Sequence, residues 1–269
     1  MKGEKLEIQV ATMNGKFFQR PFEHRDPILV IDQAKSEALA EDVESPGVRV
    51  CTTLARGLSK SRNRALSLAE GDICLIADDD TSLLPGYTER ILAEFRAAPD
   101  ADIITFQVRT PEGGFFKNNY GEQADWHNLR SIMRVCSIEI AFRRERVLAT
   151  GIRFDERFGL GAEFPTGEEA IFLADAIRAG LKVRYVPVPI VIHGSESSGA
   201  AFARNPGLIK AKGAMFMRIF GMWSIPISLL FALLKYKRSE LGFVRFVARM
   251  LEGKREFKGA SPLNRTHSL

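Results

Sequence analysis

Cysteine is scarce in this chain of 269 residues: Cys51, Cys74 and Cys136 are the only three, and they lie far apart. They form no CxxC pair and no Cys/His spacing typical of zinc, so a disulfide scaffold and a structural zinc domain are excluded. We expect free thiols in a reducing cytoplasm instead. The first five residues also lack the apolar core of a signal peptide, which favours a cytoplasmic protein over a secreted one.

Neither charge nor polarity is in excess. Charged residues make up 26% of the chain and hydrophobic residues 45%, which excludes wholesale disorder. The net charge is only +5, and lysine and arginine accumulate after position 203. These cations are not interleaved with aromatic residues as in a nucleic-acid groove, so we expect no nucleic-acid partner.

No apolar run reaches the roughly 20 residues that a transmembrane helix needs. The segment 219–234 has sixteen uncharged residues, with Pro226 near its middle and cations on both sides. Its composition, together with the basic residues that follow, fits a segment lying in an anionic membrane interface, and hence a peripheral membrane location. A buried helical hairpin packed on the rest of the protein is the alternative.

Strand-like and helix-like segments alternate along the chain. Apolar patterns predict strands at 6–13, 27–32, 48–52, 73–77, 102–108, 137–142 and 183–192, and helices within 57–70, 87–98, 143–150 and 168–179. This alternation predicts an α/β fold with a Rossmann-like, mainly parallel sheet flanked by helices. We assign this fold to residues 1–200 and a basic, apolar, C-terminal helical extension to 201–269.

A long loop and two prolines add detail to this pattern. Residues 109–136 are a long glycine-bearing segment, which we expect to be a loop that covers or forms a binding site. Its aromatic residues Tyr120, Trp126 and His127 are suited either to stacking on a sugar or to anchoring the loop. Pro187 and Pro189 predict that the last strand lies at a sheet edge, because proline cannot donate a ladder hydrogen bond.

The acidic triplet Asp78, Asp79 and Asp80 directly follows the apolar strand 73–77. Adjacent carboxylates repel one another, so their clustering is favoured only beside a cation or a donor-rich partner. In open α/β sheets, ligands bind outside the carboxyl ends of the strands, where this triplet falls. Such oxygen ligands suit Mg²⁺ or Mn²⁺ bridging to phosphate oxygens. An Asp-rich turn that caps the next helix explains the triplet equally well.

Three motifs together resemble inverting family 2 glycosyltransferases with the GT-A fold, over approximately residues 6–194. They are GLSKSRNRAL at 57–66 before the strand that ends in ADDD, FDERFGLGAEFPTGEEAIFLADAIRAG at 154–180, and a final strand ending in His193. The resemblance implies metal-dependent, inverting transfer of a sugar from a UDP- or GDP-linked donor to a hydroxyl acceptor. A saccharide or lipid-linked acceptor in bacterial polysaccharide or glycolipid assembly would follow, with Mn²⁺ or Mg²⁺ as cofactor.

The resemblance also implies roles for individual residues. A cation bound at the strand end would stabilise the charge of the departing diphosphate. The positions of the family's DxD motif are matched by Asp78 and Asp80, with Asp80 the first choice for direct metal contact and His193 a further one. A lone histidine at a strand end is as readily a structural hydrogen-bonding residue. The residues implied to bind the nucleotide sugar are Ala11, Thr12, Asp32, Arg62, Asp78 and Asp79.

Glu168 and Glu169 are the candidates for the general base, which must take the proton of the acceptor hydroxyl. Family members usually carry Glu-Asp here, with the aspartate as the base, so Glu169 aligns with the base but is one methylene longer. The choice between the two stays open. Alternatively, both are simply carboxylates that the helix dipole favours in a first turn.

Two other functions compete with glycosyl transfer. An aspartate-nucleophile phosphohydrolase also places Asp-x-Asp after an apolar strand, with Asp78 as nucleophile and Asp80 as acid. That motif prefers Thr or Val at position 82, which is Ser here, and a second acidic pair after a later strand. The other competitor is a membrane-peripheral protein that binds a nucleotide without turnover.

Overall fold

The computed structural model describes residues 3–19, 26–36, 42–194 and 205–259. The chain forms two compact units. The sheet unit comprises Met1–Glu156 and Glu168–Ser195, and the helical unit comprises Arg157–Gly167 and Glu196–Leu269. The division expected at residue 200 lies outside the described residues and stays a prediction.

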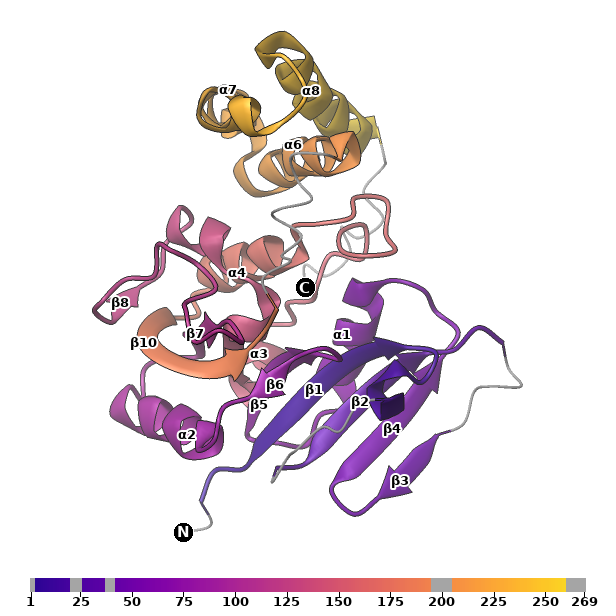
Figure 1. Cartoon of the computed structure of the whole chain (residues 1–269), viewed down its shortest axis with the longest axis vertical. Helices are drawn as coiled ribbons and strands as arrows, with labels where there is room; N and C mark the ends of the chain where they lie inside the picture. Colours follow the sequence, from indigo (N-terminus) through magenta and orange to yellow (C-terminus); the bar gives the residue numbers. More distant parts are fainter. Residues whose placement is uncertain (1–2, 20–25, 37–41, 195–204, 260–269) are drawn as a thin grey trace. The chain divides into compact units, whose positions relative to one another are not determined.

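Ten strands form one sheet in the sheet unit (Figure 1). Its central strands are buried on both faces, as uninterrupted apolar runs predict: every residue of the strand at 28–33 is buried. The strands are β1 (Leu6–Met13), β2 (Ile28–Gln33), β3 (Val43–Ser45), β4 (Val48–Thr53), β5 (Ile73–Asp78), β6 (Ser82–Leu83), β7 (Ile103–Arg109), β8 (Asp125–Trp126), β9 (Ile140–Arg143) and β10 (Val183–Ile192).

The strand order is β3-β4-β2-β1-β5-β9-β7-β10-β6, and β8 pairs with β10. Strands β4, β2, β1 and β5 are parallel neighbours, while β9 lies antiparallel between β5 and β7. The expected α/β sheet with a mainly parallel half is therefore confirmed. The parallel strands β4, β2, β1 and β5 all end at the same edge of the sheet, and the acidic triplet lies at this edge.

Helices connect and cover the strands. Tyr87, Ile91 and Phe95 are buried at the four-residue spacing that the sequence shows, and α2 packs on β10, whereas α1 packs on β1 and β2. The helices of this unit are α1 (Leu58–Leu68), α2 (Tyr87–Ala97), α3 (Arg144–Ala149) and α4 (Glu168–Arg178), with short 3₁₀ turns η1 (Lys16–Gln19), η3 (Ser131–Arg134) and η4 (Ser137–Glu139).

Strand β10 is not the outermost strand, contrary to the expectation from its prolines. Short strands pair with its two ends, β8 at Arg184 and Tyr185 and β6 at Val191 and Ile192. Between these ends, no other described strand than β7 pairs with β10, and the register to β7 shifts around Pro189. The prolines therefore occupy an irregular stretch, where a missing N–H removes little from the ladder.

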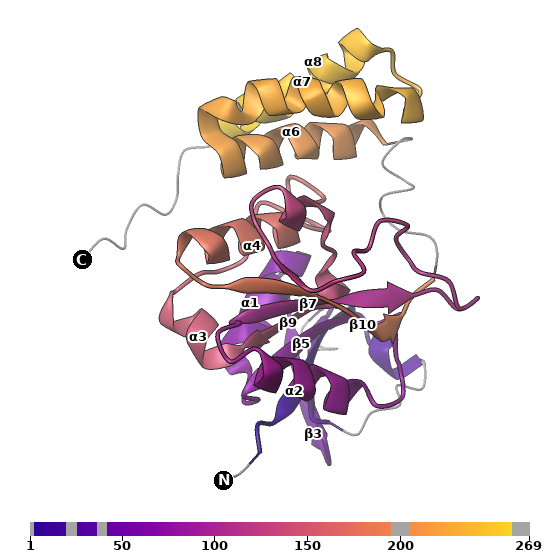
Figure 2. The same ribbon diagram turned by 90° about the vertical axis from the view of Figure 1, so that its left-hand side faces the viewer.

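The helical unit contains three long helices that lie alongside one another (Figure 2). Helices α6 and α8 cross at glycines: a Cβ on Gly213 would lie 1.9 Å from the Met250 carbonyl oxygen, and one on Gly253 1.9 Å from that of Lys210. Only glycine permits so close an approach of two backbones. The elements are α6 (Pro206–Phe220), η5 (Gly221–Trp223), α7 (Ser224–Lys235), η6 (Tyr236–Arg238) and α8 (Phe243–Gly259).

By length and composition, one described helical segment, Pro206–Arg238, is apolar enough to cross a membrane, with a mean hydropathy of 1.7. It is not one straight helix. Gly221 has a φ of 55° and ends α6, and α7 packs back on α6 and α8. The uncharged run 219–234 is thus divided at this turn. Helices α6 and α7 form a hairpin, but Leu230, Leu233 and Leu234 of α7 are exposed, so α7 is not the buried element of the alternative expectation.

The loop Arg157–Gly167 packs within the helical unit although it lies far from α8 in sequence. Phe158 and Phe164 stack with ring centroids 5.0 Å apart, and both contact Phe257 of α8, at 5.8 and 6.3 Å. Gly167 has a φ of 99°, and a Cβ there would lie 2.7 Å from the Met215 sulfur. The residue before α4 is therefore held tightly against α6.

Candidate active site

The ends of β1, β2 and β5 bring four predicted nucleotide-binding residues together. In the parallel register, Ala11 is opposite Asp78 and Thr12 is opposite Asp32. Asp78 is the last residue of β5, and the turn that follows carries the rest of the triplet. All four positions therefore lie at the carboxyl edge of the sheet, where α/β folds bind ligands.

Each carboxylate of the triplet has a different partner. The Thr12 hydroxyl donates to Asp79 Oδ2 at 2.6 Å, and Asp80 Oδ1 lies 3.3 Å from His193 Nε2. Asp78 Oδ1 lies 3.4 Å from Arg62 Nη2. The following helix, α2, has Gly86 as its N-cap and no side-chain cap, so the interpretation of the triplet as a helix cap is wrong.

Arg62 links the two acidic parts of the site. From the first turns of α1, its Nη2 reaches Asp78 and its Nη1 donates to Glu168 Oε1 at 3.0 Å, a residue 106 positions away. The Arg62 side chain is only 4% exposed. A buried guanidinium needs such charged acceptors, because an unpaired one would carry a large desolvation cost.

The pKa values of Asp78 and His193 at this edge are both raised. Desolvation raises the pKa of the Asp78 carboxyl, and Arg62 opposes that rise. The hydrogen bond to Asp80 raises the pKa of His193. Burial is thus the main cause of the first rise, and the Asp80 carboxylate is the main cause of the second.

Glu168 and Glu169 begin α4, as the sequence predicts. Glu168 is buried and ion-paired with Arg62, whereas Glu169 is half-buried. The helix dipole stabilises both carboxylates in this first turn. The two glutamates therefore differ in burial, and Glu168 is paired with Arg62 of α1.

Asp32 has one oxygen in use and one available. The Gly15 N–H donates to Asp32 Oδ2 at 2.9 Å, and Asp32 Oδ1 is buried without a hydrogen-bond partner among the described residues. An orphan buried acceptor carries a desolvation cost that a ligand donor would remove. Sequence patterns did not identify its neighbour Gln33, whose Oε1 accepts from the Gly57 N–H at 3.0 Å and fixes the start of α1.

The loop 109–136 is anchored by two of the three residues predicted either to stack on a sugar or to anchor it, Tyr120 and His127. Tyr120 hydrogen-bonds Glu139 and stacks on Tyr185 with centroids 6.4 Å apart. His127 lies between the Thr105 hydroxyl, 2.8 Å from its Nε2, and the Ser131 hydroxyl. Trp126 is 45% exposed. Of the two alternatives for these aromatic residues, anchoring holds for Tyr120 and His127.

Metal-ligating side chains do not converge into a complete site: in the described part of the chain, no group of three or more His, Cys, Asp or Glu residues is placed to hold an ion. A site of Mg²⁺ type needs only one or two carboxylates, the remaining ligands being substrate phosphates and water. Asp78 and Asp80 supply two such carboxylates at one sheet edge, so the residues present fit an ion that arrives with a diphosphate.

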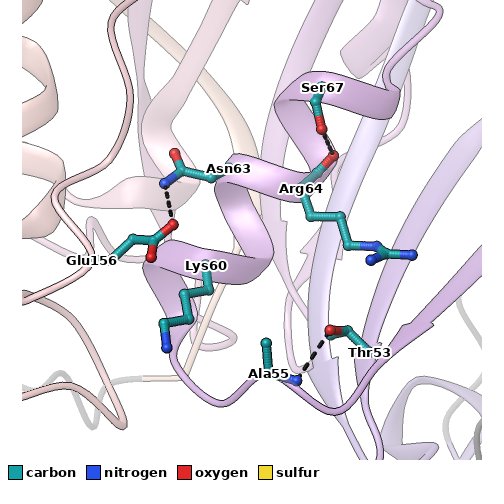
Figure 3. Close-up of a pocket in the computed structure, with 7 residues that line it drawn as sticks. All are labelled: Thr53, Ala55, Lys60, Asn63, Arg64, Ser67 and Glu156. Carbon is teal, nitrogen blue, oxygen red and sulfur yellow. Dashed lines mark hydrogen bonds between the residues drawn. The ribbon is translucent and has the colours of Figure 1, made fainter. Parts of the chain in front are cut away.

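A pocket of about 390 Å³ opens beside α1 (Figure 3). No predicted site residue lines it. Asn63 donates to Glu156 Oε1 at 3.1 Å across its wall, and the exposed cations Lys60 and Arg64 extend from adjacent turns of α1. The lining residues are Thr53, Ala55, Lys60, Asn63, Arg64, Ser67 and Glu156.

The sheet topology, with carboxylates at the ends of its parallel strands and an arginine that joins them to α4, defines a GT-A glycosyltransferase fold. The family model described as "Glycosyl transferase family 2" matches residues 19–159, and the chain belongs to this family. It is thus a glycosyltransferase, and phosphate-ester hydrolysis loses its support. Glu168, Glu169 and His193 lie beyond the matched residues.

Solved structures share this fold. S. aureus TarS 1–349 aligns with a TM-score of 0.55 and 15% sequence identity, covering 97% of this chain and 93% of that one. TarS 1–349 in complex with UDP-GlcNAc aligns with a TM-score of 0.56, 14% identity and the same coverage. Comparison with curated proteins finds no match. At such low identity, the likeness concerns the fold alone.

Proposed function

We propose that this glycosyltransferase is metal-dependent and inverting, and that it moves a sugar from a nucleoside-diphosphate donor to a hydroxyl acceptor. The observation that carries this proposal is the Arg62 bridge, which joins Asp78 at the end of β5 to Glu168 at the start of α4. This bridge joins the end of β5 to the first turn of α4, which also carries the proposed base Glu169. Arg62 also suits the oxygens of a diphosphate, because a guanidinium presents paired donors to phosphate.

The donor is proposed to carry uracil or guanine. Asp32 Oδ1 is a buried acceptor without a partner among the described residues, and it lies at the end of β2. Uracil and guanine each present a ring N–H that such an acceptor can bind, whereas neutral adenine and cytosine have none on the corresponding edge. UDP- and GDP-sugars are therefore favoured, and the UDP-GlcNAc complex of TarS is consistent with the first.

Glu169 is proposed as the general base. The acceptor oxygen attacks the anomeric carbon as the bond from that carbon to the diphosphate breaks, and the acceptor proton passes to the carboxylate. Attack opposite to the departing group inverts the anomeric configuration. Glu168 is less suited to this role, because Arg62 already occupies one of its oxygens.

Asp80 and Asp78 are proposed to hold Mn²⁺ or Mg²⁺, with His193 as a further ligand. When bound, the ion would neutralise charge on the departing diphosphate. His193 already lies at the triplet through Asp80. Thr12 orients Asp79 by its hydrogen bond, which leaves that carboxylate beside the proposed nucleotide.

The remaining parts of the proposal concern the cell. Free thiols at all three cysteines are consistent with a cytoplasmic protein. A saccharide or lipid-linked acceptor in bacterial polysaccharide or glycolipid assembly would fit a peripheral position at the inner face of the plasma membrane. The basic C-terminal helices support this position.

Isothermal titration of UDP and GDP, with and without Mn²⁺, tests the donor site. We expect Mn²⁺ to strengthen binding of both by about tenfold or more, and Asp80→Asn to remove that gain while metal-free binding persists. ADP and CDP should bind more weakly than UDP. Screening nucleotide sugars with Mn²⁺ would then identify the donor.

Two results would contradict the proposal. Mn²⁺-independent binding in the native protein would refute metal assistance. Binding of UDP or GDP without turnover of any nucleotide sugar would leave the non-catalytic, nucleotide-binding alternative.

A further inference from the structure

Helix α7 buries its small residues and exposes its large apolar ones, the reverse of an ordinary amphipathic helix. Its buried residues are Ser224, Ser228 and Ala232, one small residue per turn. Its large apolar residues face outward. The most exposed side chains of η5 and α7 are Met222 (82%), Trp223 (69%), Leu230 (59%), Leu233 (61%) and Leu234 (68%).

We call these outward residues the α7 face, defined as Met222, Trp223, Ile225, Leu229, Leu230, Leu233 and Leu234. Trp223, Leu230 and Leu234 follow one another at spacings of seven and four residues, which places them on one side of a helix. An exposed apolar surface of this kind is unfavourable in water and marks an interaction site. The helical unit does not need it for its own core, since Phe231 contacts Phe216 and Phe246 on the inner side.

The charge around the α7 face identifies its partner. Residues 205–258 carry eleven lysine and arginine residues but only three acidic ones, although the whole chain is only +5. Lys237 and Arg238 are exposed directly after α7, and Arg245 and Arg249 are exposed on α8. This excess of cations is complementary to an anionic surface, and each cation near such a surface adds to binding. Repulsion between identical cationic units opposes pairing of two copies.

Helix length decides how the face meets a bilayer. Twelve residues of α7 extend about 18 Å, which is shorter than the roughly 30 Å of a hydrocarbon core. The turn at Gly221 separates α7 from α6, so the two do not form one spanning rod. Tryptophan at one end of the face and cations at the other are typical of a helix lying at the lipid–water boundary.

We propose that the α7 face docks the protein in the plane of an anionic lipid bilayer, with its leucines in the acyl boundary and the cations of η6 and α8 on the headgroups. The inference does not depend on the chemistry of the sheet unit. It assigns the membrane contact to one helix face and separates that contact from the donor site.

Vesicle flotation of the full chain tests this assignment. The vesicles are pure phosphatidylcholine or phosphatidylcholine with about one-third phosphatidylglycerol. We expect binding to the anionic vesicles only, weakened by salt. Leu230→Ser with Leu234→Ser should lower the partition coefficient about tenfold or more, because two leucines leave the lipid. Lys237→Glu with Arg238→Glu should weaken binding to anionic vesicles similarly.

The matched control is Leu54→Ser with Leu160→Ser, which removes two exposed leucines outside α7 and should leave vesicle binding unchanged. Native protein that fails to bind anionic vesicles would overturn the assignment, and so would equal binding by the α7 variant. If detergent but not carbonate releases the protein from the vesicles, a helix spans the bilayer instead. A dimer in sedimentation velocity that the α7 variant abolishes would assign the face to a second copy. UDP binding, measured in parallel, reports on the donor site independently.

Discussion

At the scale of single residues, the three carboxylates of the triplet pair with three different side chains, and one of these, Arg62, also pairs with Glu168. Thr12 serves Asp79, His193 serves Asp80, and Arg62 serves both Asp78 and Glu168. These separate partners offset the repulsion between the adjacent negative charges of the triplet. It also distinguishes the two candidate bases, because one glutamate of the pair is held by a buried arginine.

Substitution of the two glutamates tests this distinction. We expect Glu169→Gln to bind UDP normally and to lose transfer by roughly 10²- to 10⁴-fold, because the amide cannot accept the acceptor proton. Glu168→Gln should instead lower the free energy of unfolding by about 1–3 kcal/mol, because it removes one of the two charged partners of the buried Arg62. Steady-state kinetics and urea unfolding are the measurements. Full activity of Glu169→Gln with an inactive Glu168→Gln would move the base to position 168.

At the scale of elements, the loop 109–136 is a fixed part of the sheet unit. Lys117 Nζ lies 2.6 Å from Glu139 Oε1, and Tyr120 hydrogen-bonds the same carboxylate. His127 joins Thr105 of β7 to Ser131 of η3. Most of these contacts join polar residues of the loop to Glu139 and Thr105 outside it, so the loop is tied to the sheet unit by satisfied hydrogen bonds.

His127 makes this element sensitive to acid. Burial lowers the pKa of His127 to about 4. In the unfolded chain its pKa is about 6.5, so the unfolded state binds more protons between these values. The contribution of His127 to the free energy of unfolding is therefore complete above about pH 6.5 and is lost as the pH falls towards 4.

Urea unfolding across this pH range, compared between native protein and His127→Asn, isolates that contribution. We expect the native protein to lose about 1–3 kcal/mol more than the variant between pH 6.5 and 4, since each unit of pKa shift corresponds to about 1.4 kcal/mol. If the free energy of unfolding changes equally with pH in the two proteins, the fold does not hold His127 neutral.

At the scale of the whole molecule, the two units share the chain in an interleaved way. The loop Arg157–Gly167 belongs to the helical unit, yet its last residue is bonded to Glu168, the first residue of α4 in the sheet unit. Phe158 and Phe164 are fully buried, and both contact Phe257 of α8. The C-terminal helices therefore help to fix the segment that leads into the proposed base.

Phe257→Ala tests whether this packing matters for transfer. We expect turnover to fall roughly ten- to hundredfold with little change in the Kd for UDP, because a misplaced base affects chemistry more than donor binding. Phe243→Ala is the matched control, since Phe243 contacts Tyr236 and lies away from Phe257 along α8. Equal losses in the two variants would indicate general destabilisation of the helical unit rather than a link to α4.

The sequence by itself determined the order of the elements and the position of the acidic triplet. The short apolar runs at 27–32 and 73–77 predict strands by their length and flanking residues, and the four-residue spacing of Tyr87, Ile91 and Phe95 predicts a helix. The family resemblance followed from motifs at fixed separations, and the family match confirmed it. The roles of the individual site residues stay predictions.

Only the tertiary structure decided which charges pair and which faces are buried. Arg62 meets Glu168 from 106 positions away, and no local pattern records such a partner. The run 219–234 is apolar on all sides, so its periodicity does not tell which side packs inward. The small residues of α7 decide this, because they admit close packing and leave the leucines outside. Pairing and burial depend on contacts distant in sequence, which form only when the chain is folded.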